Sequence, residues 1–190
     1  MILASSSPRR RELLAQIGVR FHIDVADIYE TPYPGEGAVA YVERMALQKA
    51  LKVAERRPGQ VVLGSDTSVI FNGQILGKPD SDAAAIDMLT ALSGQTHEVL
   101  SAVAVVNEQK SRVISVATKV RFRELSRSEI EQYVATGEPR DKAGSYGIQG
   151  MGAILVAGIE GSYSNVVGLP LTETAALLNE FDVPVWQASN

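Results

Sequence analysis

The sequence predicts an α/β fold in which helices flank a mixed β-sheet. Three observations lead to this class. Short apolar or alternating runs, typical of strands, are interleaved with segments of helical periodicity along all 190 residues. Two pairs of strands follow one another so closely that they predict antiparallel hairpins. The length fits about one domain, and no internal repeat or low-complexity linker divides it.

The N-terminal half of the chain begins with a short apolar strand and a helix. Ser7 is placed to cap this helix, Pro8 takes its first position, and Gly18 follows its last turn. The elements expected next are a strand over 21–25, a loop over 29–37, a helix over 38–57 and a strand over 61–71.

A two-residue turn at Asn72-Gly73 then predicts a hairpin in which Phe71 pairs with Gln74. The C-terminal half continues with helices over 81–92, 126–134 and 171–181, strands over 99–106, 112–122 and 153–157, and a glycine-spaced loop over 144–152.

The composition excludes several classes of protein. The chain has no cysteine, so a disulfide scaffold, a zinc finger and a thiol nucleophile are excluded. Its net charge of −4 has the wrong sign for a protein that coats nucleic acid. No apolar run is long enough for a membrane span, and the N-terminus does not read as a signal peptide. We therefore expect a cytoplasmic location, with neither nucleic acid nor membrane as a partner.

Basic residues are concentrated at the start of the first helix. Residues 1–20 carry four arginines and one acid, whereas the remaining 170 residues carry 14 basic and 21 acidic side chains. Arg9 and Arg10 lie in the first turn, where the helix dipole disfavours cations unless an anion is bound. With the Ser5 hydroxyl nearby, the pattern favours a phosphate site over a solvated helix face.

The hairpin residues offer a carboxylate and a lysine. If pairing continues beyond the turn, Thr67 lies opposite Lys78, and Asp66 points to the other face unless the strand end is bulged. A carboxylate there can act as a base or a metal ligand. Taken alone, Gly-Ser-Asp-Thr is more often a turn that hydrogen-bonds to itself.

Three further residues are candidates for ligand binding because of the segments in which they lie. Glu30 stands in a proline-bounded loop, where acids are usually solvated. Lys49 falls on the apolar stripe of the helix over 38–57, so it either snorkels or faces a ligand. Gln149 lies between glycines, and its amide suits the edge of a nucleobase, although irregular surface turns have the same composition.

Together these segments resemble the Maf family of nucleoside triphosphate pyrophosphatases along nearly the whole chain. The motifs that carry the resemblance are Leu3-Ala4-Ser5-Ser6-Ser7-Pro8-Arg9-Arg10, Gly64-Ser65-Asp66-Thr67, Gly77-Lys78-Pro79, residues 141–150 and Asn165-Val166-Val167-Gly168-Leu169-Pro170. The resemblance implies an elongated fold akin to the inosine-triphosphate pyrophosphatases, with residues 1–190 forming one domain whose two lobes enclose a nucleotide cleft. It also implies a homodimer and a divalent cation.

The resemblance assigns roles to individual residues. Asp66 would be the proton acceptor, and the residues that hold phosphates or line the cleft would be Ser5, Arg9, Arg10, Glu30, Lys49 and Lys78. Arg10, Thr67 and Gln149 would set the base specificity, as in the branch that acts on dTTP and UTP. Gly77 departs from this branch, in which some members carry Glu.

The expected reaction is hydrolysis of dTTP and UTP to the monophosphate and pyrophosphate. Water activated by Asp66 and a metal attacks the α-phosphorus, and Arg9, Arg10 and Lys78 stabilise the leaving pyrophosphate. Glu30 and Asp66 are the candidate ligands for Mg²⁺ or Mn²⁺. The alternatives are the 7-methyl-GTP branch of the family and a nucleotide-binding regulator of septum formation without turnover.

Overall fold

The computed structural model describes residues 1–188, and the chain divides into two compact units. The first unit contains Met1–Thr67, Ser101–Val116 and the chain from Gly168 onward, whereas the second contains Ser68–Leu100 and Ala117–Val167. Seven strands form a mixed sheet in the order β2-β1-β3-β5-β6-β7, with β4 paired to β3. The long strands β3 (Val62–Phe71), β5 (Thr96–Val106) and β6 (Ser111–Phe122) contribute to both units. The predicted mixed sheet with flanking helices is confirmed.

In the first unit, a short strand opens the chain and is paired on both sides. β1 (Ile2–Leu3) lies between β2 (His22–Ile23) and β3, parallel to both, with Ile2 opposite His22 and Val62. The helix α1 (Pro8–Gln16) connects β1 to β2. The strand expected over 21–25 is thus confirmed in place but only two residues long.

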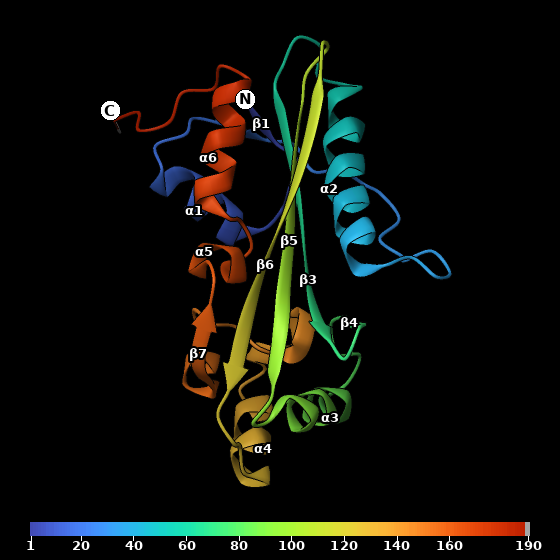
Figure 1. The fold of residues 1–190 in the computed structure, drawn as a ribbon, viewed down its shortest axis with the longest axis vertical. Coiled ribbons are helices and arrows are strands. Elements are labelled where there is room, and N and C mark those ends of the chain that lie inside the picture. Colours follow the sequence, from blue (N-terminus) through green and yellow to red (C-terminus); the bar gives the residue numbers. More distant parts are fainter. Residues whose placement is uncertain (189–190) are drawn as a thin grey trace. The chain divides into compact units, whose positions relative to one another are not determined.

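The helix α2 (Ala38–Ala54) packs closely on β3. Its buried stripe consists of Tyr41, Val42, Met45, Ala46, Lys49, Ala50 and Val53. The contact is close because β3 carries Gly64 at that point: a Cβ there would overlap the carbonyl oxygen of Ala46 and lie 2.7 Å from the backbone nitrogen of Ala50. Figure 1 shows α2 on one side of the strands and α1 and α6 (Leu171–Glu180) on the other.

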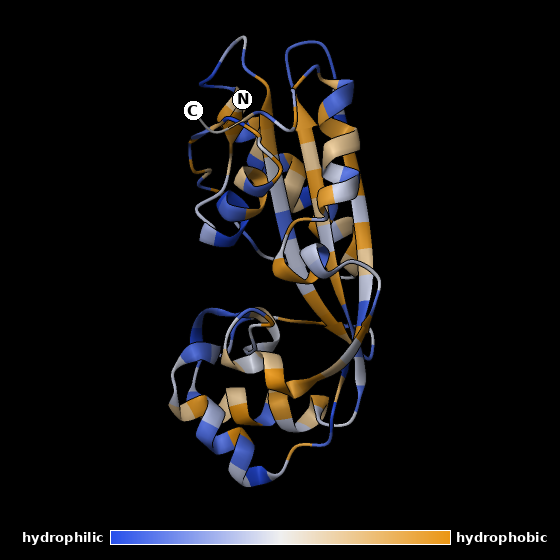
Figure 2. Cartoon of the chain, turned by 90° about the vertical axis from the view of Figure 1, so that its left-hand side faces the viewer, coloured by the Kyte–Doolittle hydropathy of each residue, from blue (hydrophilic) through white to orange (hydrophobic). Residues whose placement is uncertain are grey.

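In the second unit, the hairpin of β3 and β4 (Gln74–Leu76) has the predicted register, with Phe71 opposite Gln74. Its helices α3 (Asp82–Leu92) and α4 (Arg127–Ala135) begin where the sequence indicates, because Ser81 and Ser126 each accept a hydrogen bond from a backbone N–H of the first turn. Along the helices, apolar and polar residues are interspersed, whereas the strands carry longer apolar runs (Figure 2). These runs supply much of the buried core.

The strand expected over 153–157 is present but shifted by three residues. Residues Met151–Leu155 form the 3₁₀ helix η3, and the strand β7 is Val156–Glu160, paired with β6. The carboxylate of Glu138 accepts the N–H groups of Met151 and Gly152, the first two residues of η3, and so fixes the start of the 3₁₀ helix that takes the place of the first three strand residues. The sequence pattern also missed three short elements: η1 (Glu138–Asp141), η2 (Ala143–Ser145) and α5 (Tyr163–Val167).

None of the helices within residues 1–188 combines the length and the hydropathy that a bilayer-spanning segment requires.

Candidate functional site

The N-terminus of α1 is capped by serine and carries no acid in its first turn. The Ser7 side chain accepts the N–H of Arg10 at 3.4 Å, as the sequence indicates. Ser5, which is buried, accepts the N–H of Ser7 at 3.2 Å. Arg9 is partly exposed in the same turn. The start of the helix therefore brings serine hydroxyls and guanidinium groups together, which is chemistry suited to phosphate.

The guanidinium group of Arg10 is held by three parts of the first unit. Its Nε donates to the carbonyl of Gly168 at 3.0 Å, Nη1 donates to Ser5 Oγ at 3.3 Å, and Nη2 donates to Thr67 Oγ1 at 3.1 Å. Burial lowers the pKa of Arg10, and the charge of Asp66 opposes this effect. Arginine stays charged in proteins, so the group is a fixed cation beside that carboxylate.

Thr67 is itself fixed by the neighbouring strand. Its Oγ1 lies 2.8 Å from the Oγ of Ser101, a fully buried residue of β5. The sequence analysis missed Ser101, since a serine within an apolar strand carries no distinguishing signal. Gly168 does lie within one of the family motifs, yet its carbonyl contact with Arg10 could not be read from that motif.

Lys49 connects two carboxylates. Its Nζ lies 2.8 Å from Asp66 Oδ1 and 2.9 Å from Glu30 Oε2. Lys49 and Asp66 are buried, with 8% and 6% of their surface exposed, whereas Glu30 is exposed. The buried stripe of α2 explains the placement, because Lys49 follows Tyr41 and Met45 along it. The lysine is therefore an ion-pairing residue directed inward.

The loop that carries Glu30 is fixed to α2. Tyr41 donates its hydroxyl to the carbonyl of Glu30 at 3.2 Å, and burial raises the pKa of Tyr41 to about 12. Arg44 donates to both carboxylate oxygens of Glu36 at 2.6 Å, and this pair lowers the pKa of Glu36 to about 2. The Arg44 guanidinium also lies 3.9 Å from the centre of the Tyr33 ring. These contacts hold the backbone around Glu30 in place without using its carboxylate.

Lys78 and Gln149 belong to the second unit, and both are exposed there. Lys78 follows β4, whose last pair is Leu76 with Val69. The predicted pairing of Thr67 with Lys78 is therefore wrong, because β4 ends before that register position.

The donor set can be compared with what a divalent cation requires. Within residues 1–188, no group of three or more His, Cys, Asp or Glu side chains comes together. Asp66 and Glu30 do converge on a single ammonium nitrogen. Mg²⁺ is commonly held by one or two carboxylates plus substrate phosphates and water, so this pair fits a cation that arrives with a nucleotide.

Comparison with known proteins agrees with the fold and the motifs. The model of a protein family described as Maf-like protein matches residues 1–181. A dTTP/UTP pyrophosphatase from Myxococcus xanthus is 54% identical over 190 residues, covering 100% of this chain and 96% of that protein. A protein of the same name from Hahella chejuensis is 52% identical, covering 98% of this chain and 94% of that protein. Another from Moorella thermoacetica is 54% identical, covering 98% of this chain and 97% of that protein.

Proposed function

The chain belongs to the Maf family, and from that premise we propose that it hydrolyses dTTP and UTP to the monophosphate and pyrophosphate. The observation that carries the proposal is the ion-paired group Glu30–Lys49–Asp66 in the same unit as the capped, arginine-bearing start of α1. The substrate is proposed from the names of the relatives, and the catalytic carboxylate is proposed from this ion-paired group.

Asp66 acts as the general base. Its carboxylate accepts a proton from a water molecule that attacks the α-phosphorus, and the bond from that phosphorus to the bridging oxygen breaks. The electron pair leaves with pyrophosphate, whose charge is stabilised by Arg9, Arg10 and Lys78. Lys49 holds the Asp66 carboxylate through the 2.8 Å ion pair.

A bound Mg²⁺ or Mn²⁺, held by Asp66 and Glu30 together with phosphate oxygens, would supply a Lewis acid at the reacting phosphate. Ser5 and Arg10 bind phosphate from the start of α1. Arg10, Thr67 and Gln149 discriminate the base, which is the role that the family resemblance assigns to them. The enclosing cleft, the homodimer and the cytoplasmic location stay predictions.

The test is pyrophosphate release from dTTP, UTP, CTP, ATP, GTP and 7-methyl-GTP with Mg²⁺. We expect the parent protein to prefer dTTP and UTP, and Asp66→Asn to lower kcat by about 10²–10⁴-fold. Binding of a non-hydrolysable α,β-methylene analogue of dUTP should persist in that variant. Asp87→Asn on α3, an exposed acid of the second unit, is the matched control and should change nothing.

Other results of this experiment would favour one of the alternatives or refute the role of Asp66. Preferred cleavage of 7-methyl-GTP would place the chain in the other branch of the family. Tight binding by the parent without any release of pyrophosphate would favour the regulator of septum formation. Equal turnover by parent and Asp66→Asn would refute Asp66 as the base.

A further inference from the structure

The glycine-rich segment that carries Gln149 is anchored by one carboxylate of the second unit. Glu138, in η1, accepts the N–H of Met151 at 2.8 Å through Oε2 and the N–H of Gly152 at 3.0 Å through Oε1. Its Oε1 also accepts the hydroxyl of Tyr133 at 2.8 Å. Three donors therefore converge on a side chain that none of the roles above uses.

Tyr133, from α4, joins the two sides of the segment. Its hydroxyl donates to Glu138 and accepts the N–H of Gly147 at 3.2 Å. Gly147 precedes Gln149 and Gly152 follows it, so the hydroxyl and the carboxylate together close the chain on both sides of the glutamine. Burial followed by the bond to Glu138 raises the pKa of Tyr133, so this hydroxyl keeps its proton.

The glycines allow this close packing. A Cβ at Gly150 would overlap the carboxylate of Glu138 and lie 2.7 Å from its Cδ. A Cβ at Gly152 would lie 2.6 Å from the Tyr133 hydroxyl oxygen, and one at Gly147 would lie 2.7 Å from Cε of Lys142. The glycine spacing, which the sequence analysis related to a ligand, thus also serves close packing around Glu138.

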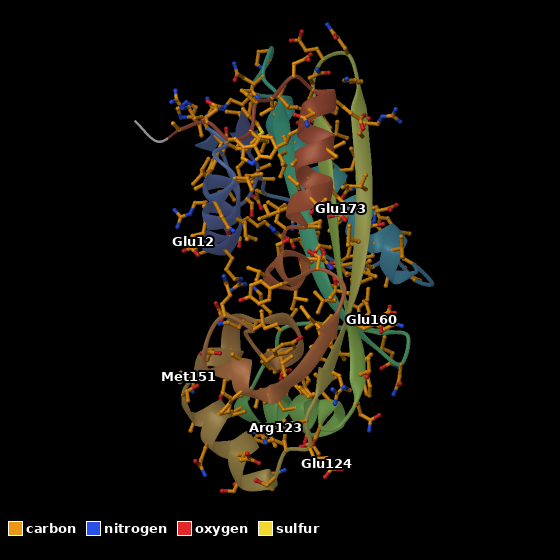
Figure 3. The ribbon with its side chains drawn as sticks, turned by 60° about the vertical axis from the view of Figure 1, so that its left-hand side comes forward. Glu12, Arg123, Glu124, Met151, Glu160 and Glu173 are labelled. Atoms are coloured by element: carbon orange, nitrogen blue, oxygen red, sulfur yellow. The ribbon has the colours of Figure 1, made fainter. Side chains whose placement is uncertain are left out.

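A second anchor holds the segment just before Gln149. The hydroxyl of Tyr146 lies 2.7 Å from Nε2 of His97, and its ring contacts Phe122 with centroids 4.7 Å apart. Tyr146 and His97 are buried, whereas Gln149 is exposed and Met151 lies at the surface (Figure 3). The glutamine is therefore displayed between two fixed points.

The carboxylate of Glu138 is ionised where it binds the segment. Burial by itself would raise its pKa, but the N–H groups of Gly152 and Met151 and the hydroxyl of Tyr133 outweigh that effect and lower it. Hydrogen bonds to a charged acceptor are stronger than those between neutral groups, so they hold this backbone firmly.

We propose that Glu138, supported by Tyr133, is a positioning residue that presents the Gln149 amide to the base of the nucleotide. The inference rests on the proposed function, because it assumes that Gln149 reads the base. An amide distinguishes bases only when its donor and acceptor are held in one orientation, and Glu138 fixes the backbone from which that amide extends.

The experiment compares Glu138→Gln, Tyr133→Phe and Glu131→Gln. Glu131 is an exposed acid of α4 that pairs with Arg127, so it is a matched control. For the first two variants we expect KM for dTTP and UTP to rise about tenfold while kcat changes less than about threefold. The preference for dTTP over CTP should fall by a similar factor, and the control should match the parent.

A double-mutant cycle with Gln149→Ala then separates positioning from general damage. If Glu138 acts through Gln149, Glu138→Gln should cause no further loss of preference in the Gln149→Ala background. A fully additive loss, or an equal fall in kcat for every nucleotide, would overturn the proposal. Tyr133→Phe, which removes only a hydroxyl, carries the same test if Glu138→Gln does not fold.

Hydrogen exchange provides a readout that needs no turnover. The amides of Met151 and Gly152 should exchange about tenfold faster in Glu138→Gln than in the parent, and unchanged exchange would overturn the anchor itself. A parent protein that cleaves no nucleotide, with this exchange difference intact, would instead refute the proposed function.

Discussion

The ammonium nitrogen of Lys49 lies 2.8 Å from the Oδ1 oxygen of Asp66, and both side chains are buried. Two elements meet in this pair, since Lys49 comes from α2 and Asp66 from β3. A charge removed from water is costly unless it is paired, so each group requires the other.

Replacing Lys49 by methionine should therefore destabilise the protein. The substitution keeps the apolar stem but leaves Asp66 buried without its partner, and we expect a loss of about 3 kcal/mol in the free energy of unfolding. Urea denaturation at pH 7 measures it. Lys52→Met, at an exposed position of the same helix, should change stability by less than about 0.5 kcal/mol. Equal effects in the two variants would contradict the buried pair.

Gly64→Ala should weaken the contact between β3 and α2. The new Cβ would overlap the backbone of Ala46, which cannot rotate away, so we expect a loss of about 1–3 kcal/mol. Gly77→Ala is the control, because a Cβ at Gly77 meets nothing within 4 Å. Thermal unfolding of both variants tests the prediction, and an unchanged melting temperature for Gly64→Ala would refute it.

His97 should make stability depend on pH between about 4 and 6.5. Burial lowers its pKa from 6.5 to about 4, so between these values the unfolded chain binds a proton that the folded chain does not. This contribution to stability is therefore complete above about pH 6.5 and decreases as the pH falls toward 4.

Urea denaturation from pH 7.5 to 4.5 measures this slope, and His97→Gln, which does not titrate, should reduce it. An NMR titration gives the pKa of the imidazole directly. A midpoint near 6.5 in the folded protein would contradict the buried environment.

Thr67→Val should impair the discrimination of the base. Valine keeps the shape of threonine but removes the oxygen that accepts from Arg10 and contacts Ser101. We expect the ratio of kcat/KM for dTTP and UTP to that for CTP to fall about tenfold, since the guanidinium loses one of its three anchors. Steady-state kinetics with Thr90→Val, an exposed position on α3, as control would test this; wild-type kinetics in Thr67→Val would exclude the role.

Much of the fold could be predicted because its signals are local. Ser7 caps the first helix as predicted, the helices expected from residues 81 and 126 begin directly after Ser81 and Ser126, and Asn72-Gly73 forms the expected turn. These features depend on a few consecutive residues. The strand expected over 153–157 begins three residues later, because the 3₁₀ helix η3 occupies Met151–Leu155, and the first two N–H groups of η3, those of Met151 and Gly152, are bound by Glu138, more than ten residues away. Periodicity within a segment contains no information about such a partner.

The candidate site also has features that follow from local sequence and features that depend on tertiary contacts. The sequence by itself determined that Lys49 lies on the buried stripe of α2, because that follows from helical spacing, whereas its assignment of catalytic and binding roles stays a prediction. Only the tertiary structure decided that Lys49 joins Asp66 to Glu30, and that Arg10 reaches Gly168 across 158 residues of chain. Contacts between such distant segments arise when apolar faces pack and bring polar groups together, and no local pattern specifies them.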